Sequence, residues 1–138
     1  PDGKTAHFTD TVTHRVMRVA LDAEGWPKGE PEVFLDLTHD PSGPDGAVVD
    51  AQGLLWLAQW GAGRVSAFAP DGSLVRHVAF DAPHTSCPAF GGNDLTTLFC
   101  TSALQGMDAA ARAAQPNAGM TFRVEGVTKG QREHRVLP

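Results

Sequence analysis

Short apolar runs alternate along the chain with turns rich in glycine, aspartate and proline. The run Ala47 to Val49 is small and β-branched, which favours a buried strand. The tripeptide Ala51-Gln52-Gly53 predicts a tight turn, because glycine adopts positive φ angles without steric cost. Leu55, Leu57 and two tryptophans predict a second strand directly after this turn.

The same order of elements recurs at a spacing of roughly 40–50 residues, which is typical of β-propeller blades of four strands. The predicted second strands follow glycine turns at Gly3, Gly53 and Gly92. Third strands are predicted at Arg15 to Ala20, Arg64 to Ala69 and Gly119 to Val124. Fourth strands are predicted at Glu32 to Leu37, Leu74 to Phe80 and Glu133 to Val136. The intervening Trp26 to Pro31 is expected to be a linker, and the alanine-rich Met107 to Gln115 a short helix.

The fold class is therefore all-β, and the chain is expected to cover about two and a half to three blades of a β-propeller. We treat residues 1–138 as one domain, with a partial blade at 1–42 and further blades at 43–82 and 83–138. Propellers close with about four to eight blades, so we expect the chain to be part of a ring, with a first strand before Pro1. Unclosed strand edges predict self-association or pairing with a missing N-terminal half.

Charge and cysteine content exclude several classes of function. The net charge is −5, with 11 Lys and Arg against 16 Asp and Glu, which disfavours nucleic acid and anionic membranes as partners. No apolar run has the length of a membrane span, and the default expectation is a cytoplasmic protein. Cys87 and Cys100 fit two small buried hydrophobic side chains, with a disulfide or a metal site as open alternatives.

Candidate site residues gather where propeller geometry brings strand ends together. Asp45 lies at the entrance of a predicted first strand, and first strands line the central channel. The ends of second strands meet the same rim, which adds Asp10, Gln59 and Trp60 as candidate substrate contacts. Carboxylate, hydroxyl and amide oxygens around a channel suit a hard divalent cation. For Asp45 the alternative is a turn aspartate that binds its own backbone amides.

Other conspicuous residues have simpler explanations. The six histidines do not follow a zinc-binding spacing, although His84 lies close to the channel entrance in sequence. Ser102 lacks the Gly-x-Ser-x-Gly context of a serine hydrolase. Asp22, Asp50 and Asp71 are expected to form side-chain-to-backbone turns.

Several motifs together resemble the senescence marker protein/gluconolactonase family, which includes regucalcin. They are Pro44-Asp45-Gly46 with Asp50-Ala51-x-Gly53-x-Leu55-Trp56, then Gly61-x-Gly63-Arg64-Val65, Thr85-Ser86-Cys87 through Gly91-Gly92, Leu98 to Ala103 with Gly106-Met107, and Gly119 to Val124. The motifs run in family order over roughly residues 1–126, and they correspond to the C-terminal half of the family's six-bladed propeller.

The resemblance implies a metal-dependent hydrolase that opens sugar lactones, with one divalent cation in the channel: Ca²⁺ first, with Zn²⁺, Mg²⁺ or Mn²⁺ as alternatives. The family binds this metal through an N-terminal Glu, a middle Asn and the Asp of the Pro-Asp-Gly motif. Only the last has a counterpart here, so the resemblance implies that Asp45 is both a metal ligand and a catalytic residue. An isolated chain of this length is expected to be inactive. The alternative is a non-catalytic propeller fragment that acts in binding or assembly.

Overall fold

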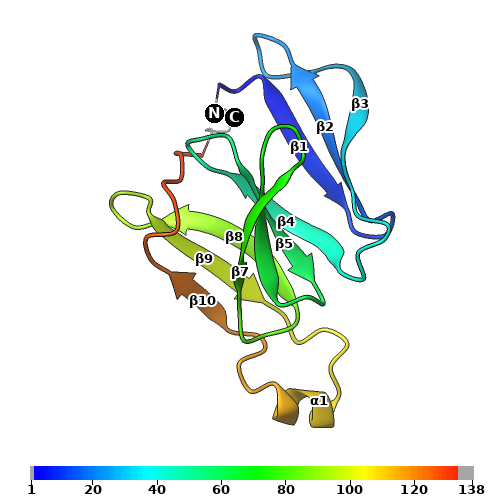
Figure 1. The fold of residues 1–138 in the computed structure, drawn as a ribbon, viewed down its shortest axis with the longest axis vertical. Helices are drawn as coiled ribbons and strands as arrows, with labels where there is room; N and C mark the ends of the chain where they lie inside the picture. Colours follow the sequence, from blue (N-terminus) through cyan, green and yellow to red (C-terminus); the bar gives the residue numbers. More distant parts are fainter. Residues whose placement is uncertain (1, 134–138) are drawn as a thin grey trace.

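The computed structural model describes residues 2–133 and contains three antiparallel sheets that lie side by side as consecutive blades (Figure 1). The first sheet has the order β1-β2-β3, the second β4-β5-β6-β7 and the third β8-β9-β10. Their bounds are β1 Thr5–Asp10, β2 Arg15–Leu21, β3 Pro27–Asp36, β4 Gly43–Val49, β5 Leu55–Trp60, β6 Arg64–Phe68, β7 Leu74–Ala79, β8 Thr85–Gly91, β9 Thr97–Ser102 and β10 Thr121–Val124. A single described helix, α1 (Ala109–Ala114), lies in the loop between β9 and β10.

The second sheet lies between the other two and carries the core on both of its faces. Trp56 and Ala58 pack toward the third sheet with Leu98 and Cys100, whereas Leu55 and Leu57 pack toward the first sheet with Val16 and Leu35. β5 is therefore buried along nearly its whole length. Each fully buried leucine side chain contributes about 1.5–3 kcal/mol to folding.

A buried carboxylate joins the second sheet to the end of the chain. Asp50 follows β4 and is fully buried. Its Oδ1 accepts hydrogen bonds from the backbone N–H groups of Gln52 and Leu54, and its Oδ2 accepts from Trp56 Nε1 (3.0 Å) and Thr128 Oγ1 (3.2 Å). The same residue pairs with Gly130 through an isolated β-bridge. The segment after β10 is thus fixed at the end of β4 that lies opposite Asp45.

Most predicted elements are present, with one error in the first sheet. The segment expected to be a linker, Trp26 to Pro31, was predicted wrongly, because β3 begins at Pro27. β3 is an edge strand with register shifts against β2, and edge strands tolerate prolines. For the fourth strand predicted in the third sheet, Glu133 belongs to no strand and 134–136 lie outside the described residues. The assignment of 1–138 as one domain stays a prediction.

The helix and the turns formed as expected. Asp108 caps α1, accepting a hydrogen bond from the backbone N–H of Ala111 at 2.8 Å. Asp22 and Asp71 each accept a hydrogen bond from the backbone two residues later, which confirms the turns predicted for them. Within residues 2–133, no helix is long and apolar enough to cross a membrane.

Candidate functional site

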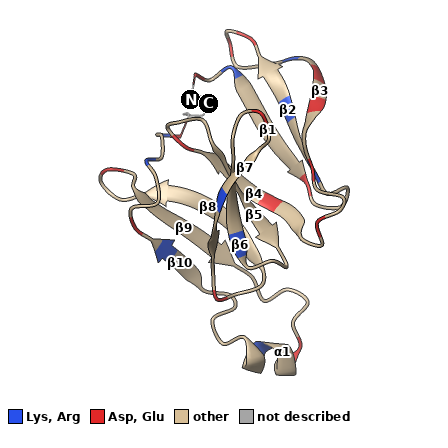
Figure 2. Cartoon of the chain, viewed as in Figure 1, with Lys and Arg blue, Asp and Glu red and all other residues tan. Residues whose placement is uncertain are grey.

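Asp45 lies in a β-bulge near the start of β4. Pro44 pairs with Gln59 and Ala47 pairs with Leu57, so Asp45 and Gly46 together oppose the single residue between those partners. A bulge bends its strand and changes the direction of the side chains within it. Asp45 is half-buried, and it is the acidic position coloured red in β4 in Figure 2.

The neighbouring sheet repeats this bulge at the equivalent place. Thr85 pairs with Ser102 and Pro88 with Cys100, so Ser86 occupies in β8 the position that Asp45 occupies in β4. The two strands touch here, since a Cβ built on Gly46 would lie 2.7 Å from the carbonyl oxygen of Ser86. Asp45 and Ser86 therefore lie at the same level of adjacent first strands.

The Asp45 carboxylate differs from every other aspartate of the chain in its hydrogen bonding. No group within residues 2–133 donates a hydrogen bond to it. The other ten aspartates each accept at least one hydrogen bond from a backbone N–H or a side chain: Asp2, Asp10, Asp22, Asp36, Asp40, Asp50, Asp71, Asp81, Asp94 and Asp108. Asp45 therefore does not form the backbone turn that was the alternative explanation, and both of its oxygens can accept an external partner.

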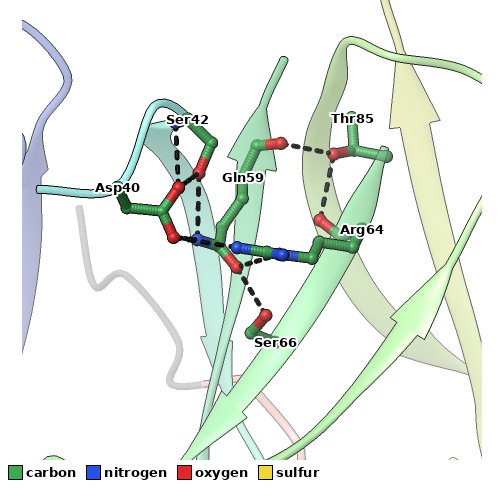
Figure 3. Close-up of polar contacts among 6 residues, drawn as sticks. All are labelled: Asp40, Ser42, Gln59, Arg64, Ser66 and Thr85. Carbon is green, nitrogen blue, oxygen red and sulfur yellow. Dashed lines mark hydrogen bonds and ion pairs between the residues drawn. The ribbon is translucent and has the colours of Figure 1, made fainter. Parts of the chain in front are cut away.

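The sequence predicted Gln59 as a substrate contact at the channel rim, whereas the structure buries its side chain. It is 2% exposed and lies in a polar network at the end of β5 (Figure 3). Its Nε2 donates to Asp40 Oδ2 (3.1 Å) and to Ser42 Oγ (3.0 Å). Its Oε1 accepts from Arg64 Nε (2.8 Å) and from Ser66 Oγ. All hydrogen-bonding groups of this side chain are thus engaged within the protein, so substrate contact by Gln59 stays an untested prediction without structural support.

Asp40 and Arg64 complete this network. Arg64 donates to Asp40 Oδ2 at 2.8 Å, and Ser42 donates to Asp40 Oδ1 through both its backbone N–H and its hydroxyl group. Burial alone would raise the pKa of Asp40, but the bonds from Ser42, the charge of Arg64 and the amide of Gln59 outweigh it and lower the pKa. The network ties the loop before β4 to β5 and β6, and so fixes the approach to Asp45.

Asp10 and Trp60 lie at strand ends, as predicted, and their contacts differ. Asp10 is exposed at the end of β1, where its carboxylate accepts hydrogen bonds from the backbone of Val12 and Thr13. The Thr13 bonds lower the pKa of Asp10. Trp60 is half-buried at the end of β5, and its ring stacks on His84 with centroids 4.4 Å apart. Whether either residue contacts substrate stays a prediction.

The described residues do not form a complete metal site. Residues 2–133 contain no group of three or more His, Cys, Asp or Glu side chains that could hold a metal ion. A carboxylate that accepts no hydrogen bond within residues 2–133 has the oxygen-donor chemistry that hard divalent cations take. Figure 2 shows Lys and Arg positions on several strands, among them β2, β6 and β10.

The two cysteines are both free. Cys100 is buried in β9, and burial raises the pKa of its thiol to about 12, which keeps the thiol protonated and unreactive at neutral pH. Cys87 is exposed in β8, and a Cβ built on Gly46 would lie 3.2 Å from its Cβ. The thiol of Cys87 thus lies near the bulge that carries Asp45.

Two cavities lie away from Asp45. One, of about 540 Å³, separates the first sheet from the second and is lined in part by His7, Phe34 and Val49. The other, of about 460 Å³, is an open depression beside Asp40 and Arg64. Asp45 lines neither cavity.

Sequence reasoning missed the partners of Gln59 and the equivalence of Ser86 with Asp45. Asp40 and Gln59 are 19 positions apart, and nothing local to either residue marks their contact. One signal was present: Gln59 is the second-last residue of a strand whose preceding residues are apolar on both faces, so a buried position could have been expected. The equivalence of Ser86 with Asp45 requires Pro44 to be aligned with Thr85, and this register is set by the pairing of each first strand with its neighbour.

Comparison with known proteins gives a consistent result. Residues 1–104 match the family described as the SMP-30/Gluconolactonase/LRE-like region. A protein of Rhizobium meliloti (strain 1021), named provisionally as a sugar lactone lactonase, is 50% identical over 96% of this chain and 46% of its own length. The 6-deoxy-6-sulfogluconolactonase of Pseudomonas putida is 35% identical over 88% of this chain and 42% of its own length.

Solved structures agree with the sequence relatives. The crystal structure of regucalcin from Agrobacterium tumefaciens, described as a calcium-binding protein, has a TM-score of 0.87 and 41% identity, covering 94% of this chain and 46% of that one. The chain thus spans under half the length of the relatives it matches, and its three sheets form a partial β-propeller. It belongs to the SMP-30/gluconolactonase/LRE-like family.

Proposed function

We propose that the complete protein containing this chain is a metal-dependent hydrolase that opens sugar lactones, and that Asp45 is the catalytic and metal-binding residue supplied by this chain. The observation that carries the proposal is the Asp45 carboxylate, which alone among the aspartates accepts no hydrogen bond from residues 2–133. Leaving a carboxylate without partners inside a fold that pairs all the others is explained if an external group binds it. The lactonase names of two relatives supply the substrate class.

The cation is proposed from the donor chemistry of Asp45 and from the calcium-binding description of the Agrobacterium relative. Ca²⁺ is the first choice, with Zn²⁺, Mg²⁺ and Mn²⁺ as alternatives, because a carboxylate can bind each of them. Such a cation polarises the lactone carbonyl and stabilises negative charge on its oxygen. Further ligands are expected from blades outside this chain.

Asp45 has two roles in this proposal. One oxygen holds the cation, and the carboxylate also accepts a proton from the water that attacks the lactone carbonyl. The bulge in β4 and the polar network around Gln59 hold the strand that presents this carboxylate. Asp45 is therefore positioned by rigid elements, as catalytic geometry requires.

Replacing Asp45 tests the proposal directly. In the complete protein, Asp45→Asn should lower kcat for gluconolactone by at least about 100-fold, the usual scale for losing a general base. Titration calorimetry with Ca²⁺ should show weaker binding by the variant. Asp71→Asn is the matched control, because Asp71 is exposed in a turn. Wild-type kinetics and calcium affinity in Asp45→Asn would refute the proposal.

The alternative function is a non-catalytic propeller fragment used in binding or assembly. It is favoured by the finding that residues 2–133 provide no three-ligand group, and by the edge of β1, which pairs only with β2 within those residues. In that case the 138-residue chain should self-associate through its strand edges. Its affinity for Ca²⁺ should be the same alone as after reconstitution with further blades. A lactonase activity in the complete protein that depends on Asp45 would exclude this alternative.

A further inference from the structure

The strands around Asp45 form successive levels that lead outward to the rim. At the innermost level, Gly46 of β4 touches Ser86 and Cys87 of β8. One level outward, Pro44 pairs with Gln59, whose carbonyl oxygen accepts a hydrogen bond from Thr85 Oγ1 at 3.1 Å. At the next level, Gly43 pairs with Trp60, and Trp60 stacks on His84. The Trp60–His84 pair therefore stands at the rim, two levels outward from the bulge that carries Asp45.

The backbone around His84 is held on all sides. The carbonyl oxygen of Pro83 accepts hydrogen bonds from the N–H groups of Gly61 and Gly63, both at 3.0 Å. The carbonyl oxygen of His84 accepts from Ala103 N at 3.0 Å. The Thr85 hydroxyl group bridges to the second sheet through the carbonyl oxygens of Gln59 and Arg64. The backbone that carries the His84 ring is thus fixed between the second and third sheets.

The imidazole of His84, like that of His14, keeps one nitrogen unpaired inside the fold. Its Nδ1 is buried and has no hydrogen-bond partner among the described residues, whereas its Nε2 is not buried. A buried polar atom without a partner destabilises a fold, and a phenylalanine would stack on Trp60 equally well. Because no described group fixes the tautomer, Nε2 can either donate or accept a hydrogen bond. That property matches a hydroxyl group, which also does both.

We infer that the Trp60–His84 pair forms the rim-side wall of the lactone site, and that His84 binds a hydroxyl group of the sugar through Nε2. The inference rests on the proposed function for the substrate class only. The substrate's apolar C–H groups lie against the aromatic wall, and its hydroxyl groups face polar atoms. His84 contributes to binding and not to the proton transfer at Asp45, so its effect falls on KM.

The test combines binding, kinetics and stability in the complete protein. His84→Phe keeps the stack and removes both nitrogens. We expect the KM for gluconolactone to rise about 3- to 10-fold, the value of one neutral hydrogen bond, with kcat unchanged. The melting temperature should stay level or rise, because the unpaired Nδ1 is gone. His84→Gln, which can donate and accept, should recover part of the affinity. His77→Phe, on the exposed outer strand β7, is the control and should change neither value.

Binding can be followed without catalysis. In a Trp26→Phe background, which removes the exposed tryptophan of this chain and leaves Trp60 and the buried Trp56, tryptophan fluorescence should change saturably with added gluconate, and His84→Phe should raise the Kd by the same 3- to 10-fold. Unchanged affinity in His84→Phe overturns the inference, and so does lost affinity together with a lower melting temperature. If the wild-type protein binds gluconate through His84 but opens no lactone, only the proposed function fails. If the wild-type protein neither binds gluconate through His84 nor opens lactones, the inference and the proposed function both fail.

Discussion

At the scale of single residues, the aspartates of this chain show how backbone geometry decides the role of one side-chain type. Asp50 and Asp71 accept hydrogen bonds from the backbone that follows them, whereas Asp45 accepts none from the described residues. Asp71 also precedes a glycine, as Asp45 does, so the sequence alone could not separate a turn aspartate from an available one. The difference comes from the register shift in β4, which depends on pairing with β5 and is not encoded locally.

Replacing Asp50 should cost far more stability than replacing Asp71. Asp50→Ala leaves the buried Trp56 Nε1 and two partly buried backbone N–H groups without an acceptor, so we expect a loss of about 3–5 kcal/mol in the free energy of unfolding. Asp71→Ala affects an exposed turn and should cost less than about 1 kcal/mol. Urea denaturation of both variants measures these values. Equal losses in the two variants would contradict the buried role of Asp50.

At the scale of elements, strands with glycine turns were predictable and long-range pairings were not. β2 and β6 both begin at the predicted residue, because a turn, a basic residue and a β-branched residue mark each start. β3 was missed at its beginning, since Pro27 and Pro31 indicate a linker unless the strand is known to be an edge. The Gln59 network was missed because it joins two strands, β5 and β6, to the loop before β4.

The contact between β4 and β8 makes Gly46 sensitive to any added side chain. In Gly46→Ala, the new Cβ would lie 2.7 Å from the Ser86 carbonyl oxygen and 3.0 Å from Cys87 Cα, so one strand must shift. We expect a loss of about 1–3 kcal/mol in unfolding free energy, and weaker calcium binding by the complete protein. Ala47→Ser, at an exposed position of the same strand, is the control. A Gly46→Ala protein with unchanged stability would show that the two strands separate easily.

At the scale of the whole molecule, carboxylates with lowered pKa values determine the response to acid. Hydrogen bonds from a nearby hydroxyl or backbone N–H lower the pKa of Asp36, Asp71 and Asp94, and Asp40 is lowered in spite of its burial. The unfolded chain therefore binds protons at a higher pH than the folded chain does. On acidification, His7 takes up a proton at a higher pH than the aspartates do. Burial lowers the pKa of His7 from 6.5 in the folded chain, so its protonation again favours the unfolded chain.

The free energy of unfolding should consequently be steady above about pH 7, decline slightly below about pH 6.5 and fall steeply below about pH 4. Chemical denaturation at a series of pH values measures this profile. His7→Gln should remove the decline in the free energy of unfolding near pH 6 and leave its steep fall below about pH 4 unchanged. A protein equally stable at pH 3 and pH 7 would show that these aspartates titrate alike in both states.

The hydrogen bond from Thr128 to Asp50 can form only after both residues have been synthesised. The two residues are 78 positions apart, so at about 5–20 residues per second Thr128 is made about 4–16 s after Asp50. Until then, Oδ2 of Asp50 has only the Trp56 indole as its donor, and the end of the middle sheet remains incomplete. The middle and last blades consequently reach their final stability together, after Thr128 has been made, and a ribosome stalled between them holds a nascent chain that proteases can still cut.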